Sequence, residues 1–312
     1  MRIGLILPTM GPHASPEAVD AAAAAAVRLG WSSVWVTDHL LVARGDEADT
    51  YGRILEALTT LAWVAGRHPE VRIGTSAVIP AMRDAPQLAK ELATIDVLSG
   101  GRLIVAVGVG DRSDEPEWSN LGKADRMGLR GAYLDEAIAL WRHLWAGRVE
   151  PFHGRFHQLE SFVFDPLPTQ GAALPIWSGG RSEAALNRAA TLSDGYHASQ
   201  TGPDDLRERW PVVLEKSRAA GRPRPTLSVR SRVRFDAPAG SVYSLHASTR
   251  AMVDDLLAFD QIGVDELVVV FDRPPTGRTV EAEMERFETQ VVAEYRTARR
   301  ELDEATRESY SM

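Results

Sequence analysis

The sequence of 312 residues contains no cysteine. Disulfide bonds, thiolate nucleophiles, iron–sulfur clusters and cysteine-based zinc sites are therefore excluded. A surplus of basic residues is also lacking, because 35 Lys and Arg stand against 43 Asp and Glu, a formal net charge of −8. An acidic chain repels phosphate backbones, so we expect no nucleic-acid partner.

Long hydrophobic runs are absent as well. No apolar stretch approaches the roughly 20 residues that span a bilayer, so we expect no membrane partner. The first apolar run, residues 3–7, is too short for the hydrophobic region of a signal peptide and predicts a strand. These features predict a cytoplasmic protein.

Short apolar runs alternate with helix-length amphipathic segments. They predict eight strands, each followed by a helix, and this alternation favours a (β/α)8 TIM barrel over an open doubly wound sheet. We expect one α/β barrel domain over residues 1–300 and a polar, frayed C-terminal tail over 301–312. The predicted strands are 3–7, 34–37, 71–79, 103–109, 175–178, 196–199, 226–235 and 266–271; the predicted helices are 16–29, 53–67, 84–98, 129–145, 182–192, 204–220, 249–262 and 280–300.

Two segments interrupt this alternation. Residues 151–171, after the fourth helix, carry four phenylalanines among polar residues and predict a β-hairpin insertion. Residues 237–248, after the seventh strand, predict a second, irregular insertion. His153 and His157 have the spacing of zinc ligands on a helix, but they fall on the hairpin without a third ligand, so we expect them to be structural.

Active sites of such barrels lie at the carboxyl ends of the strands, so the polar residues there are the candidates. Asp38 and His39 follow the second strand. They form either a cofactor-binding carboxylate beside a proton-handling imidazole, or a loop cap beside a satisfied polar residue. Ser178, Gly179, Gly180 and Arg181 follow the fifth strand and open a helix. They suit an anion such as a phosphate, or form an ordinary tight turn.

Two glycines, Gly108 and Gly110, follow the fourth strand. They do not belong to a dinucleotide fingerprint, because the sixth position is Ser113. Glycines here would instead let a flat ring approach the backbone, since no side chain intervenes. Arg230, Arg232 and Arg234 alternate along the seventh strand; they are either exposed or ion-paired, or at least one of them reaches an acidic cofactor tail or substrate.

Several of these segments resemble the luciferase-like monooxygenase superfamily, in the order in which that superfamily has them. The resemblance covers roughly residues 1–200 and implies a barrel that binds FMN or the deazaflavin coenzyme F420 at its C-terminal mouth. The matching segments are VWVTDH (34–39), IGTSAVIP (73–80), LSGGR (98–102), AVGVG (106–110), the helix from LDE (134–136) to LW (144–145), FHG (152–154), PIWSGG (175–180) and SDG (193–195).

Asp38-His39 and Thr75-Ser76-Ala77 are most similar to the F420-dependent oxidoreductases. For those members the resemblance implies that the cofactor and substrate face Asp38 and His39, and that Ser76–Ala77 is a cis peptide forming a bulge behind the ring. It further implies ring-edge contacts from Val109 and Gly110, phosphate contacts from Ser178, Gly179, Gly180 and Arg181, and an acid role for Asp111, where the sugar-phosphate dehydrogenases of the family have a glutamate.

The resemblance leads to an oxidoreductase that moves a hydride between F420 and a small organic molecule. Residues 200–203 lack the lysine with which the sugar-phosphate dehydrogenases hold their substrate, so we expect a substrate other than glucose 6-phosphate. We also expect a homodimer.

Three other functions stay open. The first is an FMN-dependent monooxygenase with a separate reductase, which Met127 and Gly131 disfavour because that branch often has His and Tyr there. The second is a non-catalytic flavin-binding barrel. The third is a metal-dependent hydrolase using Asp38, His39 and His197.

Overall fold

Eight parallel strands form the centre of the computed structural model, which describes residues 1–45, 48–111, 113–235, 242–271 and 279–311. Neighbouring strands pair around a ring whose last member also pairs with the first, so the ring is closed and the predicted (β/α)8 barrel is confirmed. In ring order the strands are β1 (Arg2–Ile6), β2 (Ser33–Val36), β3 (Arg72–Val78), β4 (Leu103–Val107), β7 (Ile176–Ser178), β8 (Gly195–Ser199), β9 (Thr226–Phe235) and β11 (Glu266–Val270).

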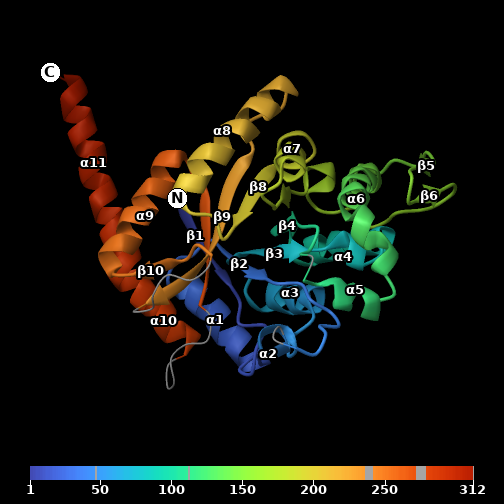
Figure 1. The fold of residues 1–312 in the computed structure, drawn as a ribbon, viewed down its shortest axis with the longest axis horizontal. Coiled ribbons are helices and arrows are strands. Elements are labelled where there is room, and N and C mark those ends of the chain that lie inside the picture. The colour runs from blue at the N-terminus through green and yellow to red at the C-terminus, as the bar shows by residue number, and fades with distance from the viewer. Residues whose placement is uncertain (46–47, 112, 236–241, 272–278, 312) are drawn as a thin grey trace.

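Helices surround this barrel (Figure 1). Their apolar sides pack on the outward-facing strand residues in one large core. The helices are α1 (Pro16–Arg28), α2 (Ala48–Tyr51), α3 (Ala57–Arg67), α4 (Ala85–Leu98), α5 (Glu115–Asn120), α6 (Arg130–Trp145), α7 (Glu183–Thr191), α8 (Pro203–Ala219), α9 (Thr249–Ile262), α10 (Val280–Phe287), a π-helical segment (Glu288–Val292) and α11 (Ala293–Ser311).

Helix starts follow local capping. Helix α1 begins at Pro16, as predicted, and the Ser15 hydroxyl before it accepts the Ala18 amide at 3.1 Å. Helix α3 begins at Ala57 rather than at the predicted residue 53, because the Glu56 carboxylate accepts the Thr59 amide at 2.7 Å. The short helices α2 and α5 were not predicted; both lie in loops that follow barrel strands.

Two tryptophans fill the barrel lumen opposite glycines. A Cβ at Gly74 would lie 2.3 Å from the Trp35 ring, and one at Gly195 would lie 2.5 Å from the Trp177 ring. The two indoles contact each other with centroids 5.4 Å apart, and His197 stacks on Trp35 at 5.4 Å. This packed layer forms a floor under the carboxyl ends of the strands.

The amino-terminal end of the lumen is closed by polar contacts. Buried Glu266 accepts hydrogen bonds from the hydroxyls of Ser32 and Ser33, and the Trp35 indole donates to Ser33 Oγ at 2.7 Å. The site must therefore lie at the other end, where the strands terminate.

The first insertion is a hairpin, as predicted. It pairs β5 (Phe152–His153) with β6 (Gln158–Leu159) and projects from the barrel (Figure 1). His157 is buried, with Nδ1 2.9 Å from Glu136 Oε1 and Nε2 3.1 Å from the Tyr133 hydroxyl on α6. His157 therefore fixes the hairpin to α6, which agrees with the structural role expected from the sequence.

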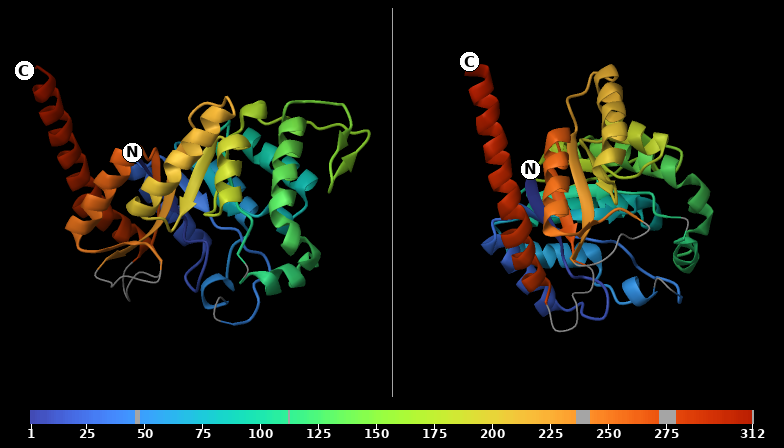
Figure 2. Two further views of the ribbon diagram at one scale, coloured as in Figure 1. Left: turned by 45° about the horizontal axis from the view of Figure 1, so that its top comes forward. Right: turned by 60° about the vertical axis from the view of Figure 1, so that its left-hand side comes forward.

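The second insertion differs from its prediction. Residues 237–241 lie outside the described residues, but the rest includes β10 (Leu245–Ala247), which pairs in parallel with β9. The prediction of an irregular segment was wrong for this stretch. In the predicted polar tail, α11 continues to Ser311 and extends away from the barrel (Figure 2).

Candidate active site

A bulge in β3 marks the mouth of the barrel. The Ser76–Ala77 peptide bond is cis, and the register with β4 shifts between Thr75 and Val78. The cis bond implied by the family resemblance is confirmed. Across from the bulge, a Cβ at Gly108 would lie 3.5 Å from the Ala77 Cβ, so only a methyl group and bare backbone meet here.

The Ser76 side chain points down into the floor. Its hydroxyl lies 2.8 Å from His197 Nε2, and His197 Nδ1 lies 3.0 Å from the Ser228 hydroxyl. Burial, and secondarily the charge of Arg230, lower the pKa of His197 to about 3. His197 is therefore neutral at physiological pH and serves as a hydrogen-bonded support rather than a proton donor.

Arg230 spans the mouth from β9. Its Nη1 donates to the Ser76 carbonyl at 2.8 Å and its Nη2 to Thr37 Oγ1 at 3.2 Å. Sequence reasoning left the role of the three alternating arginines open. In the structure, Arg230 contacts the Ser76–Ala77 bulge, which the family resemblance had indicated separately.

Asp38 supports the other side of the bulge. The carboxylate is 3% exposed, and its Oδ2 accepts the Ile79 amide at 3.2 Å. Arg83 donates to both carboxylate oxygens, from Nε at 3.1 Å and from Nη2 at 2.5 Å. Arg83 also pairs with Glu56 at 2.7 Å. Both oxygens of Asp38 thus have partners from the protein itself.

His39 forms a pair with a residue that sequence reasoning missed. Its Nδ1 lies 2.8 Å from Glu117 Oε2 on α5, while Glu117 Oε1 accepts the amides of Leu40 at 2.5 Å and Leu41 at 3.0 Å. The ring of Tyr51 from α2 stacks on His39 with centroids 4.3 Å apart. His39 is thereby held by one carboxylate and one aromatic face.

Opposing effects act on the pKa of His39. Burial lowers it, but the hydrogen bond and charge of Glu117, with the charges of Asp114 and Asp38, outweigh burial and raise the pKa above its ordinary value. The Glu117 pKa is lowered in turn, against burial, by His39 and the Leu40 and Leu41 amides. The pair therefore holds a proton on His39 more firmly than an isolated histidine would.

We expect Glu117→Gln to lower the pKa of His39, as followed by NMR titration. A raised folded-state pKa stabilises the folded protein below the unfolded value of about 6.5, and this contribution disappears as the pH rises through the folded-state pKa. The loss of unfolding free energy in Glu117→Gln should therefore be larger near pH 5.5 than near pH 8.5, which lie roughly one unit or more below and above the unfolded-state pKa of His39. An unchanged His39 titration would contradict the assigned pairing.

The turn after β7 divides the four predicted phosphate residues into two groups. Ser178 is fully buried with its hydroxyl 2.5 Å from Ser193 Oγ, and the Gly179 amide donates to the Val107 carbonyl at 3.0 Å. Gly180 (φ +120°) and Arg181 are exposed at the start of α7. The first two residues build the turn, and the last two can reach a ligand.

The loop after β4 turns back on itself. Gly110 has φ +72°, and the Asp111 amide donates to Asp114 Oδ2 at 2.7 Å. The Asp111 carboxylate is exposed and Val109 is half-buried. The loop starts beside the bulge, because the Gly108 amide donates to the Val78 carbonyl at 3.0 Å.

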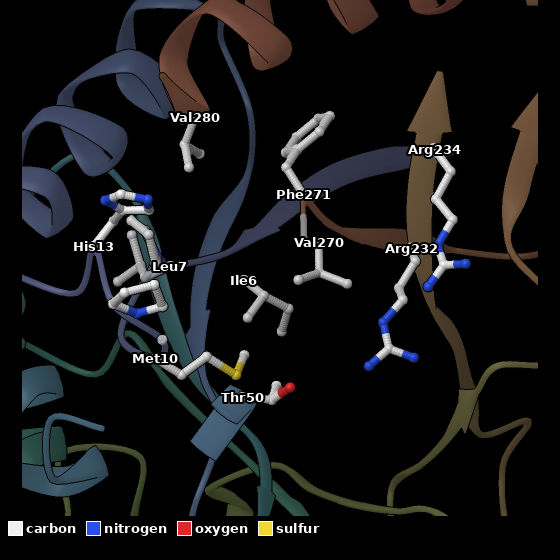
Figure 3. Close-up of a pocket in the computed structure, with 13 residues that line it drawn as sticks. Ile6, Leu7, Met10, His13, Thr50, Arg232, Arg234, Val270, Phe271 and Val280 are labelled. Carbon is white, nitrogen blue, oxygen red and sulfur yellow. The ribbon is translucent and has the colours of Figure 1, made fainter. Parts of the chain in front are cut away.

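A cavity of about 310 Å³ opens at the ends of β1, β9 and β11 (Figure 3). In the closed ring, these strands lie across the mouth from β7, β3 and β4. The described residues that line the cavity are Ile6, Leu7, Pro8, Met10, Gly11, Pro12, His13, Thr50, Arg232, Arg234, Val270, Phe271 and Val280.

The residues that the structure describes contain neither a metal-binding group of side chains nor a helix that could cross a membrane. No group of three His, Asp or Glu side chains is arranged to hold a metal ion there. Asp38, His39 and His197 have separate partners: Arg83, Glu117 and Ser76. None of the helices in the described ranges combines the length and the apolar character needed to cross a membrane.

The chain can be assigned to a known protein family. The model of the luciferase-like monooxygenase family matches residues 1–305, and the chain belongs to this family. F420-dependent glucose-6-phosphate dehydrogenase of Amycolatopsis mediterranei is 34% identical over 203 residues, 62% of this chain and 57% of the relative. The Kineococcus radiotolerans enzyme of the same name is 30% identical over 196 residues, 62% and 56%. The chain thus spans a little more than half the length of these relatives.

Solved structures share the fold over nearly the whole chain. An F420-dependent secondary alcohol dehydrogenase in complex with an F420–acetone adduct has a TM-score of 0.78 and 18% identity, and the match covers 94% of this chain and 98% of that one. The oxygenating constituent of 3,6-diketocamphane monooxygenase from Pseudomonas putida, in complex with FMN, has a TM-score of 0.72 and 15% identity, with 93% and 98% covered.

Proposed function

We propose that the protein is an F420-dependent oxidoreductase that transfers a hydride between this deazaflavin and a small organic substrate. The observation that carries the proposal is the bulge at Ser76–Ala77, which faces side-chain-free backbone at Gly108. Close to it in the chain fold, His39 on the loop after β2 pairs with Glu117 on α5. A flat ring fits against a methyl group and bare backbone. The cofactor, when bound, supplies the hydride chemistry.

The residues of this chain would bind and orient that ring. Ala77, Val109 and Gly110 would contact it, while Gly180 and Arg181, at the exposed start of α7, would hold its phosphate. Arg230 and Asp38 would keep the bulge in place through the Ser76 carbonyl and the Ile79 amide. The role proposed for Asp38 is thus one of support, which differs from the direct cofactor contact implied by family resemblance.

His39 would handle the proton that accompanies hydride transfer at the substrate. Its raised pKa keeps the imidazole protonated further toward neutral pH, and Glu117 fixes the ring through Nδ1, which leaves Nε2 to act. Asp111, with its exposed carboxylate beside the mouth, is the second candidate for an acid role. The names of the two relatives described above, both F420-dependent dehydrogenases, support the choice of cofactor.

The alternative is an FMN-dependent monooxygenase that a separate reductase supplies. It is favoured by the FMN complex among the proteins of the same fold. Fluorescence titration with F420, and in parallel with FMN, separates the two proposals. Tight F420 binding with weak FMN binding is the expected result, whereas tight binding of FMN alone would overturn the F420 proposal. Cofactor binding without turnover on any substrate would indicate a non-catalytic barrel.

A second prediction concerns the surface offered to the ring. Gly108→Leu should raise the dissociation constant for F420 about a hundredfold or more, because the isobutyl group would occupy the place of the ring. Circular dichroism should show a retained fold, since a Cβ at Gly108 contacts nothing closer than the Ala77 methyl at 3.5 Å.

The matched control is Gly66→Leu on α3, where a Cβ would meet nothing within 4 Å. Gly66→Leu should leave cofactor affinity unchanged. Equal affinities in both variants would show that the ring does not lie against Gly108.

The finer properties predicted from the sequence stay predictions. These are the cytoplasmic location, the homodimer, and a substrate other than glucose 6-phosphate. The last is supported by the absence of lysine in residues 200–203.

A further inference from the structure

The cavity at the ends of β1, β9 and β11 is not used by the proposed cofactor contacts. Those contacts come from β3, β4 and the β7–α7 turn, which lie on the opposite side of the ring of strands. A cavity of about 310 Å³ lies within the range of small-molecule sites, which begins at roughly 300 Å³. It is thus of a size for the second reactant rather than for a second cofactor.

One wall of the cavity is apolar. Ile6 and Met10 from the end of β1, with Val270 and Phe271 from the end of β11, present only carbon and sulfur to its interior (Figure 3). Such a wall favours an aliphatic or aromatic body and disfavours a sugar, whose hydroxyls would lose their hydrogen bonds to water.

The opposite wall is cationic. Arg232 and Arg234 extend from β9, and Figure 3 shows both side chains on the side facing these apolar residues. Among the described residues that line the cavity, none carries a carboxylate. Both arginines also contact other parts of the protein. Because each guanidinium has five N–H donors, it can bind a carboxylate in addition.

One residue of the cavity wall leads to the proposed proton donor. Thr50 lines it, and the next residue, Tyr51, stacks on His39 with centroids 4.3 Å apart. A molecule held by the arginines at one end could therefore extend across the mouth toward His39. This places the reacting group and the anchored group at opposite ends of one substrate.

We propose that the substrate is an organic carboxylate with an apolar body, whose carboxylate is bound by Arg232 and Arg234. The inference rests on the proposed function, because it treats the cavity as the substrate part of an oxidoreductase site. The apolar body packs on Met10 and Phe271, and the reducible or oxidisable group lies toward His39.

The test uses two probes of matched shape, trans-cinnamate and trans-cinnamamide, with calorimetry on the F420-loaded protein. Cinnamate should bind about ten- to a hundredfold more tightly than the amide, because a charge-assisted bidentate contact is lost in the amide. In Arg232→Met/Arg234→Met this preference should fall to about threefold or less. The control Arg148→Met, at an exposed site after α6, should keep the full preference.

Three results would overturn the inference. One is equal affinity for acid and amide in the unaltered protein, and another is no binding of cinnamate up to about 10 mM, a binding free energy weaker than about −3 kcal/mol. The third is a double variant that loses affinity for F420 but keeps the cinnamate preference, which would assign the arginines to the acidic tail of the cofactor. Failure of F420 to bind the unaltered protein would instead refute the proposed function, and is measured first.

Discussion

His39→Ala should reduce turnover by about 10²- to 10⁴-fold, the usual contribution of a general acid or base. Affinity for F420 should change little, because the proposed cofactor contacts come from the bulge, the loop after β4 and the start of α7. Steady-state kinetics with saturating cofactor, together with fluorescence titration, separate the two quantities. The effect should fall mainly on kcat, since the group acts on the reacting atoms rather than on binding.

The pH profile adds a readout that a purely structural role would not change. In the reaction direction in which His39 donates a proton, kcat should fall at high pH as His39 loses that proton, and the raised pKa of His39 sets where this fall occurs. Glu117→Gln should move the fall in kcat to lower pH. His153→Gln, at an exposed hairpin position, is the matched control and should retain full activity. Full turnover in His39→Ala would remove His39 from the mechanism.

Asp38→Ala should lower the free energy of unfolding by about 3 kcal/mol, at the lower end of the range for breaking a buried ion pair. The loss has two sources: Arg83 loses its bidentate partner, and the Ile79 amide loses its acceptor. The remaining pair with Glu56 moderates it. Urea unfolding measures the change.

A double-variant cycle distinguishes an unpaired charge from lost packing. Replacing both partners, in Asp38→Leu/Arg83→Met, should restore about half of the stability or more, because neither charge of the buried pair remains. Glu56, which also loses Arg83, is 37% exposed and keeps the Thr59 amide as a partner. Asp204→Ala, whose carboxylate is exposed on α8, should change stability little. Should Asp38→Ala instead unfold like Asp204→Ala and lose cofactor affinity, Asp38 would face the cofactor, as family resemblance implies.

The barrel could be predicted because its strands are short apolar runs with helices between them, a pattern that local sequence carries. The bulge and the strand-end residues followed from strand position and resemblance. Glu117 could not be found in this way. It lies 78 residues from His39 on a six-residue helix, and no periodicity in the loop after β4 distinguishes its carboxylate from those of Asp114 and Glu115.

Side-chain direction was the other limit. Ser178 was a reasonable phosphate ligand by position, but strand geometry directs its hydroxyl to Ser193. Arg230 was one of three arginines at a spacing of two, which places them on one face of a strand without saying whether that face is the lumen. Which face of β9 points into the lumen is fixed only when the ring of strands closes, and closure depends on the whole chain.

The tryptophan–glycine contacts in the lumen have a consequence for redesign of this site. Trp35 lies against Gly74 and supports His197, which in turn is hydrogen-bonded to Ser76 under the bulge. The depth of the proposed active site is therefore set by Trp35 and Gly74, which lie below the His197 layer that supports the bulge. Smaller side chains at the mouth alone would therefore not deepen the site. Trp35 and Gly74 have to be replaced together, so that one residue gains the volume that the other loses.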